Sequence, residues 1–150
     1  MIYIAADHAG FELKKEIKNY LTLKGIQTTD LGPKTLNPKD DYPDFAFLLA
    51  KKTAADPKNK GILLCRSGIG MTIAANKIKG ARAALCLSEL QAQKARQHNN
   101  ANILVLAADF SAKKEIKKII KKFLETSFST EERHIRRVNK IKIFERLVVK

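Results

Sequence analysis

At 150 residues the chain is long enough to bury a substantial core, and its hydrophobic content of 45% is that of a globular protein rather than a disordered one. No apolar run approaches the roughly 18 residues that a membrane-spanning helix needs, so we expect no membrane association. We expect one domain over residues 1–150.

The net charge of +14 could indicate a nucleic-acid-binding protein. Much of the excess lies in a stretch where lysines alternate with Ile116, Ile119, Ile120 and Phe123, which predicts an amphipathic helix with a solvated lysine face. Because no stretch combines aromatic with basic residues for base stacking, we expect no nucleic-acid partner. The positive surplus would still help to attract a small anionic substrate.

The two cysteines, Cys65 and Cys86, each end a different candidate strand, so we expect both to be unpaired. Unpaired cysteines fit a reducing compartment. The opening residues Met1–Asp7 lack the basic start and the cleavage site of a secretory signal peptide. We therefore expect a cytoplasmic protein.

Short apolar runs alternate with amphipathic segments along the first half of the chain, and glycine or proline separates many of them. The elements predicted there are a strand at Ile2–Ala6, a helix at Phe11–Lys24, a more polar strand nearer an edge at Ile26–Leu31, a loop at Gly32–Pro43, a helix from Tyr42 through Lys52, a strand at Ile62–Leu64 and a helix at Ile69–Lys77.

The same alternation continues in the second half. Ser88 followed by Gln91 is the pattern of a capping box at a helix start. The predicted elements are a strand at Ala81–Cys86, a helix at Ser88–Arg96, a polar break at Gln97–Asn100, a strand at Ala101–Leu106, a helix from its cap Ser111 to about Glu125, and a last helix from Ser129 or Thr130 through Phe144.

Five strands that alternate with helices predict an open parallel sheet with helices on both faces, a Rossmann-like three-layer α/β/α fold of five strands with an extended C-terminal helix. In such folds ligands bind beyond the carboxyl ends of the strands. Asp7-His8 follows the first strand and Cys65–Gly70 follows the third, so both lie at the expected edge. His98-Asn99 instead precedes the fifth strand, and it can reach that edge only if its turn folds over or if it comes from another subunit.

The turn Cys65-Arg66-Ser67-Gly68-Ile69-Gly70 combines a thiol, a hydroxyl and two glycines where a strand leads into a helix. Such a turn directs backbone N–H groups and the positive end of a helix dipole at a bound anion. The same field favours a thiolate, which would make Cys65 a base or a nucleophile. The alternative is that Cys65 is a small buried hydrophobic residue of the core.

Other candidate residues each have a structural alternative. Asp7-His8 could cap a helix start instead of forming a site, and His98 could be a surface turn residue. Tyr42 could be a core anchor beside a proline. Arg133 and Arg137, spaced i, i+4, would point the same way and suit a phosphate, although they could also lie on a solvated face. We find no cluster of metal-ligand residues in the sequence.

Several ordered motifs give the chain a specific resemblance to a known family. They are Ala6–Phe11, Asp41-Tyr42-Pro43, Cys65–Gly70 with Ile73–Lys77, Arg96–Asn99, and Arg133-His134 with Arg137-Val138. Over nearly its whole length the chain resembles the ribose-5-phosphate isomerase B family of sugar-phosphate isomerases. The resemblance implies interconversion of ribose 5-phosphate and ribulose 5-phosphate through an enediolate, in the pentose phosphate pathway, with neither metal nor cofactor.

The resemblance also implies roles for individual residues. Cys65 would move the proton between C2 and C1, and His98, with Asp7 nearby, would open the sugar ring. The remaining roles would fall to Asn99, which bonds the intermediate; to Ser67, Gly68, Ile69 and Gly70, which form the anion-binding turn; to His8, Arg133 and Arg137, which hold the phosphate; and to Tyr42, which lies against the sugar.

In this family two subunits share each site, so the resemblance implies a homodimer, or a tetramer of such dimers. His98 and the C-terminal arginines would then meet Cys65 across an interface. The last helix, about residues 130–150, would pack on the partner subunit.

Two positions depart from the family pattern. Arg66 stands where glycine is usual, and Asp109 stands where the family has an arginine that helps to bind phosphate. Arg66 could supply the missing phosphate contact or pair with Asp109, or it could simply point to solvent.

Two alternative functions remain open. The protein could prefer a six-carbon sugar phosphate (allose or galactose 6-phosphate), or it could be a non-catalytic phosphosugar-binding module.

Overall fold

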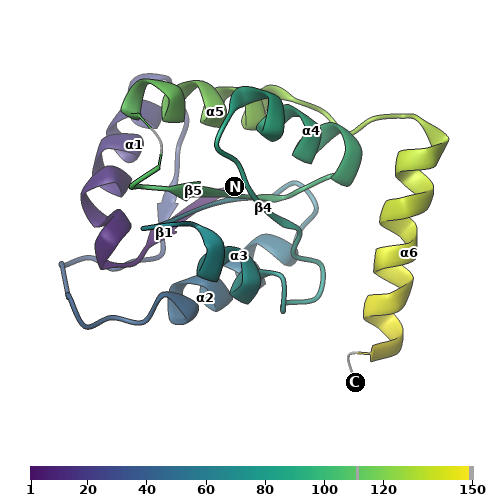
Figure 1. Ribbon diagram of the computed structural model, residues 1–150, viewed down its shortest axis with the longest axis horizontal. Helices are drawn as coiled ribbons and strands as arrows, with labels where there is room; N and C mark the ends of the chain where they lie inside the picture. Colours follow the sequence, from purple (N-terminus) through teal and green to yellow (C-terminus); the bar gives the residue numbers. More distant parts are fainter. Residues whose placement is uncertain (111, 149–150) are drawn as a thin grey trace.

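The structure is a computed structural model that describes residues 1–110 and 112–148 (Figure 1). Five parallel strands form one sheet in the order β2-β1-β3-β5-β4. The strands are β1 (Ile2–Ala6), β2 (Thr29–Asp30), β3 (Lys60–Cys65), β4 (Ala83–Leu85) and β5 (Ile103–Ala107). The predicted open parallel sheet is confirmed.

Helices cover both faces of the sheet, as the strand pattern predicted. They are the short 3₁₀ helix η1 (His8–Gly10), α1 (Phe11–Leu23), α2 (Tyr42–Ala54), α3 (Ile69–Ala75), α4 (Glu89–Asn99), α5 (Lys113–Glu125) and α6 (Glu132–Val148). Figure 1 shows α1, α4 and α5 on one face and α2 and α3 on the other. This arrangement is the predicted three-layer α/β/α fold.

Alternate residues of the central strands fill two separate cores. On β3, Ile62 and Leu64 pack with α1, α4 and α5, whereas Leu63 and Cys65 pack with α2 and α3. Successive side chains of a strand point to opposite faces, and a strand covered on both faces must be apolar at every position. The continuous apolar runs of the sequence therefore identified the central strands.

The edges of the sheet and several helix ends differ from the prediction. β2 pairs only through Thr29 and Asp30, far short of the predicted strand, although its edge position is confirmed. The predicted polar break after Arg96 is wrong, because α4 continues to Asn99 and ends where Asn100 adopts a left-handed conformation with φ 46°.

The helix starts agree with the predicted caps only in part. The last helix begins at Glu132 rather than at Ser129 or Thr130, and the Ser129 hydroxyl accepts a hydrogen bond from the Glu131 N–H. Ser88 caps α4 as predicted, and the Gln91 side chain reaches back to the N–H of Leu87. Ser111, the predicted cap of α5, lies outside the described residues.

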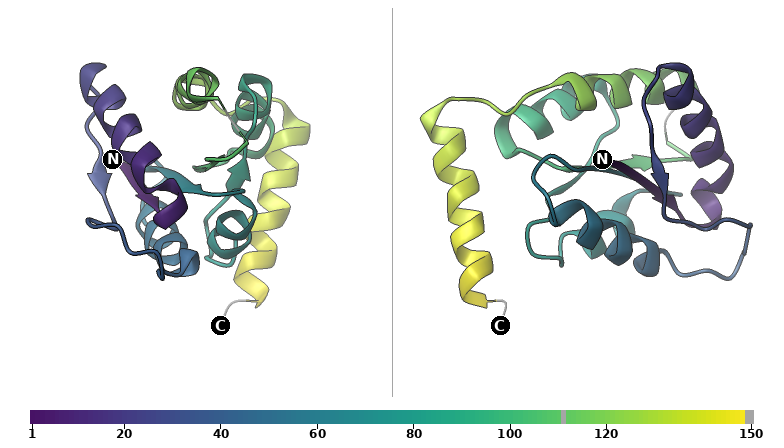
Figure 2. Two further views of the ribbon diagram at one scale, coloured as in Figure 1. Left: turned by 60° about the vertical axis from the view of Figure 1, so that its left-hand side comes forward. Right: turned by 180° about the vertical axis from the view of Figure 1, so that it is seen from behind.

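Helix α6 lies apart from the three layers. The view from behind shows it at one end of the molecule, joined to α5 by an extended segment (Figure 2, right). Its buried residues are His134 and Val138, and it leaves six large apolar side chains exposed, namely Ile135, Ile141, Ile143, Phe144, Leu147 and Val148. Over residues 1–110 and 112–148, no helix has both the length and the apolar character needed to cross a membrane.

Candidate active site

Cys65 ends β3 and begins a tight turn into α3. Its side chain is buried, and its sulfur accepts a hydrogen bond from the Gly68 N–H at 3.1 Å. Gly68 has φ +76°, and a Cβ there would lie 2.4 Å from Cδ1 of Leu85, so the turn requires glycine at this position. The turn thus brings backbone amides to the thiol, as the sequence predicted.

Burial and the backbone amides of the turn act on the pKa of the Cys65 thiol in opposite directions. Burial raises the pKa of the Cys65 thiol, and the nearby charge of Asp7 also raises it. The amides of Gly68, Met71 and Ser67 lower this pKa, but burial outweighs them. The amides of the turn therefore favour the thiolate, as the sequence predicted, but the loss of hydration on burial outweighs them.

Asp7 follows β1 and lies beside the Cys65 turn, because β1 and β3 are neighbours and Ala6 pairs with Leu64. Its Oδ1 accepts hydrogen bonds from the N–H groups of Ala9 and Gly10, at 3.0 and 3.1 Å. Asp7 therefore does cap a helix start. Burial raises the pKa of Asp7, against the effect of these hydrogen bonds and of His8.

His8 is held by a residue that the sequence reasoning did not select. Its Nδ1 lies 2.7 Å from Oδ1 of Asp40, and the same oxygen accepts the His8 backbone N–H at 3.0 Å. Asp40 comes from the loop before α2, 32 residues along the chain. No periodicity marks a loop residue of this kind, so the sequence offered no signal for the pair beyond its place next to Asp41-Tyr42-Pro43.

Tyr42 begins α2 and lies against the other end of the Cys65 turn. A Cβ at Gly70 would lie 2.6 Å from Cζ of Tyr42, so ring and backbone are in direct contact. Ser67 accepts a long hydrogen bond of 3.4 Å from the Ile69 N–H through its Oγ. The structure thus gathers the predicted residues of this end, which we call the Cys65 cluster: Asp7, His8, Tyr42, Cys65, Ser67, Gly68, Ile69 and Gly70.

Arg66 pairs with Asp109, which was one of the alternatives left open by the sequence. Its Nη1 lies 3.3 Å from Oδ2 of Asp109, and both side chains are largely exposed. The Asp109 N–H also donates to the Arg66 carbonyl at 3.1 Å. The two departures from the family pattern are therefore adjacent in space, at the rim of the Cys65 cluster.

His98 lies at the opposite end of the sheet from Cys65. In β5, Ile103 pairs with Gly61 and Ala107 pairs with Cys65. The chain therefore travels four residues, about 13 Å at 3.3 Å per residue, from the end near His98 to the level of Cys65. Within one chain the structure does not bring His98 to Cys65 or Asp7.

His98 instead forms a second group with the start of α6. Its ring stacks on His134 with centroids 4.2 Å apart, and Arg133 bonds Glu131 at 2.7 Å through its Nε. These four residues, His98, Glu131, Arg133 and His134, line a cavity of about 730 Å³ and are here called the His98 cluster. Partial burial and the nearby charge of His134 lower the pKa of His98.

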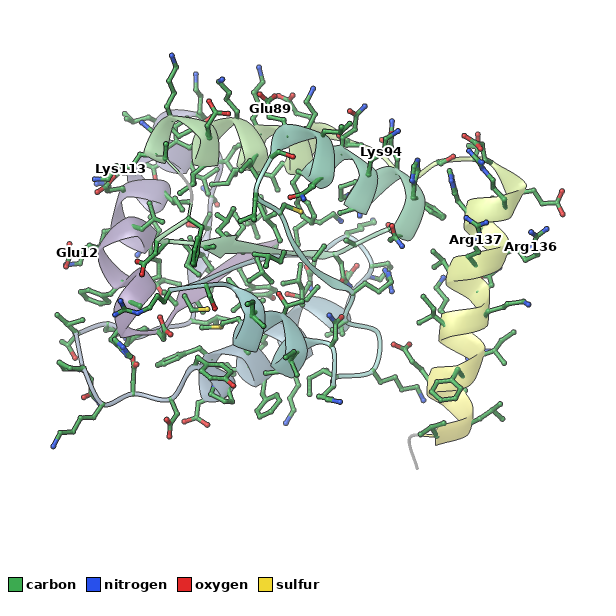
Figure 3. The ribbon with its side chains drawn as sticks, in the orientation of Figure 1. Glu12, Glu89, Lys94, Lys113, Arg136 and Arg137 are labelled. Carbon is green, nitrogen blue, oxygen red and sulfur yellow. The ribbon has the colours of Figure 1, made fainter. Side chains whose placement is uncertain are left out.

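The remaining predicted residues lie beside this second group. Asn99, the last residue of α4, lines a different hollow together with Ile141 of α6. Arg137 is exposed, and Figure 3 shows Arg137 and Arg136 leaving α6 on different sides. His134, on the same helix, is buried, and its Nδ1 has no hydrogen-bond partner among residues 1–110 and 112–148.

The chain is similar to proteins of one known family. The family model for Ribose/Galactose Isomerase matches residues 2–141. A protein of Mycoplasma pneumoniae named probable ribose-5-phosphate isomerase B is 48% identical over 97% of this chain and 95% of its own length. The ribose-5-phosphate isomerase B of Mycolicibacterium paratuberculosis is 42% identical over 97% of this chain and 91% of its own length.

Solved structures of ribose-5-phosphate isomerases are similar to this chain in both fold and sequence. The crystal structure of ribose-5-phosphate isomerase B from Mycoplasma genitalium with bound ribulose-5-phosphate has a TM-score of 0.92 and 46% identity, covering 97% of this chain and 95% of that one. The ribose 5-phosphate isomerase of Thermotoga maritima has a TM-score of 0.89 and 46% identity. The match covers 95% of this chain and 97% of that one. The chain therefore belongs to the Ribose/Galactose Isomerase family.

Proposed function

We propose that the protein is a ribose-5-phosphate isomerase that interconverts D-ribose 5-phosphate and D-ribulose 5-phosphate. The observation that carries the proposal is its 46% identity, over 97% of the chain, to an isomerase crystallised with ribulose-5-phosphate. The Cys65 cluster supports it, because a thiol that accepts an amide hydrogen bond at 3.1 Å is placed among groups that can bind an anion.

In the proposed mechanism Cys65 acts as the base. Its thiolate takes the proton from C2 of the open-chain aldose, and the carbonyl oxygen at C1 becomes the oxyanion of an enediolate. The hydroxyl proton on O2 then passes to O1, and the same thiol returns its proton to C1, which leaves the carbonyl at C2 of the ketose. Ser67 and the amides of Gly68 and Gly70 stabilise the oxyanion, since donors aimed at a developing negative charge lower the barrier. Tyr42 lies against the sugar, and His8 contacts its phosphate.

We infer that a second copy of the chain completes the site. His98, Asn99, Arg133 and Arg137 lie far from Cys65 in their own chain, and α6 exposes six large apolar side chains. In a homodimer these four residues would approach the partner's Cys65 cluster, where His98 would open the ring, Asn99 would bond the enediolate and the arginines would hold the phosphate. The same α6 face would be buried between the subunits.

The cellular setting is the remaining part of the proposal. Cys65 and Cys86 are both free and buried, which supports a reducing compartment. We place the enzyme in the cytoplasm, in the pentose phosphate pathway, where its two sugar phosphates are interconverted.

The test is turnover of ribose 5-phosphate by the purified protein in EDTA. We expect turnover to persist in EDTA and to fall by at least about a thousandfold in Cys65→Ala, because the proton-transfer base is removed. Cys86→Ala is the matched control: it removes a second buried thiol, whose pKa burial raises to about 12, and should leave turnover nearly unchanged. Faster turnover of allose or galactose 6-phosphate would instead assign a six-carbon substrate, and binding without turnover would assign a non-catalytic module.

A further inference from the structure

Asp40 makes a double contact with His8. One carboxylate oxygen, Oδ1, lies 2.7 Å from Nδ1 of the ring and accepts the backbone N–H of the same histidine at 3.0 Å. Because a carboxylate only accepts hydrogen bonds, Nδ1 must carry the hydrogen. The other ring nitrogen, Nε2, is then left for a ligand, and the His8 side chain is 36% exposed.

The loop that carries Asp40 is held at both of its ends. At its start the buried Lys14 ammonium bonds Asp30 at 2.8 Å and the Pro33 carbonyl at 2.6 Å. At its finish the Tyr42 ring lies against Gly70. Asp40 itself is tied to the loop by its N–H, which donates to the Asn37 carbonyl at 3.1 Å.

The Asp40 carboxylate is buried although one of its two oxygens has no hydrogen-bond partner among the described residues. Its side chain is only 7% exposed, and its Oδ2 has no hydrogen-bond partner among the described residues. An unsatisfied buried carboxylate oxygen costs free energy. Within these residues the carboxylate makes its one strong interaction with His8. Its effect on the structure is therefore to fix the position of that imidazole.

We propose that Asp40 is a positioning residue, which fixes the tautomer and the direction of His8 so that Nε2 meets the phosphate of the substrate. The inference rests on the proposed function for the identity of that phosphate. Asp40 does not touch the reacting carbons. Its loss should therefore weaken phosphate binding while leaving the proton-transfer step by Cys65 nearly intact.

The experiment compares wild type, Asp40→Ala, Asp40→Asn, His8→Ala and the double variant His8→Ala/Asp40→Ala. We expect Asp40→Ala to raise the KM for ribose 5-phosphate about tenfold, with kcat changed less than about threefold, as for loss of a hydrogen bond to a charged group. Asp40→Asn keeps an acceptor for Nδ1 and should recover most of the affinity. In the His8→Ala background the change at Asp40 should alter KM by less than about twofold.

The control is Asp44→Asn, which also removes one carboxylate but at an exposed position in the first turn of α2. Its KM should stay at the wild-type value, and thermal melting should confirm that every variant is folded. An unchanged KM in folded Asp40→Ala, or an equal loss in the His8→Ala background, would overturn the proposal.

Calorimetric binding of inorganic phosphate separates this inference from the proposed function. We expect Asp40→Ala to weaken phosphate binding about tenfold, as in the loss of a charge-assisted hydrogen bond, whatever sugar the enzyme prefers. If wild type binds phosphate but does not turn over ribose 5-phosphate, the proposed function fails and the role of Asp40 is still decided by this measurement. Equal phosphate affinity in wild type and Asp40→Ala refutes the role of Asp40 alone.

Discussion

Arg66 and Asp109 are two exposed side chains of opposite charge that meet at 3.3 Å beside Cys65. Exposed pairs contribute between zero and about 1 kcal/mol to stability, so the pair is not needed for folding. Its position at the rim of the Cys65 cluster leaves the guanidinium free to turn towards a bound phosphate. We propose that Arg66 makes a phosphate contact in a second position of the same flexible side chain.

The kinetics of Arg66→Gly test that second position. We expect a KM for ribose 5-phosphate raised about three- to tenfold and a melting temperature within a few degrees of wild type, because an exposed charge is lost near the phosphate. Asp109→Ala is the control. It releases Arg66 and should leave KM unchanged or lower it. An unchanged KM in Arg66→Gly would mean that the arginine serves only its partner Asp109.

The balance of burial and charge at Cys65 predicts a pH dependence. Burial and Asp7 raise the pKa of Cys65, so at neutral pH the thiol form dominates and the reactive thiolate increases as pH rises. Alkylation by iodoacetamide, followed at Cys65 by mass spectrometry, should have a midpoint above about 8.5, the value for a free cysteine. The rise of kcat/KM with pH should follow the same group.

Asp7→Asn supplies the directional check on this pH dependence. It keeps an oxygen for the amides of Ala9 and Gly10 but removes the charge that raises the pKa of Cys65, so the midpoint should fall. Cys86, whose pKa burial raises to about 12, is the internal control and should remain unmodified through this range. A Cys65 midpoint at or below about 8.5, or one that rises in Asp7→Asn, would contradict the argument.

At the scale of the elements, the sequence predicted best where one physical cause dominates. β1, β3 and β5 are covered on both faces, so their buried side chains are apolar and form continuous apolar runs in the sequence. β2 was predicted too long, since its ladder with β1 spans only Thr29 and Asp30 at an edge of the sheet. Beyond it, Leu31 and Gly32 keep only single backbone hydrogen bonds to Ile4 and Ala6.

The end of α4 shows why polar character alone does not end a helix. Gln97, His98 and Asn99 are polar but continue the helical hydrogen bonding, and the helix ends where Asn100 takes a left-handed conformation. His98 consequently belongs to a helix, where its ring stacks on His134 of α6 at 4.2 Å. That contact joins two elements distant in sequence, so no local pattern could have predicted it.

In the candidate site, too, the features set by the order of strands were predictable from the sequence, and those set by burial or by a loop conformation were not. The meeting of Asp7 and Cys65 followed from topology, because adjacent parallel strands bring their carboxyl ends together. The direction of the Cys65 pKa shift did not follow, since it depends on how burial compares with the amide hydrogen bonds. Asp40 could not be selected either, because a loop conformation places it against His8.

In the whole molecule the Cys65 and His98 clusters lie far apart, so an active site that needs both would have to combine residues of two subunits. This arrangement can be tested. A dimer of one Cys65→Ala and one His98→Ala subunit would have one site with both defects and one site with neither. Two inactive variants, mixed by co-refolding, should therefore regain up to about a quarter of wild-type turnover, since half of the dimers are mixed and one of their two sites is intact. Mixing Cys65→Ala with Cys65→Ala/His98→Ala, the matched control, restores no intact site. Because a site built within one chain cannot be repaired by exchange, no recovery in the first mixture would show that each chain acts alone and that His98 does not serve the partner's Cys65.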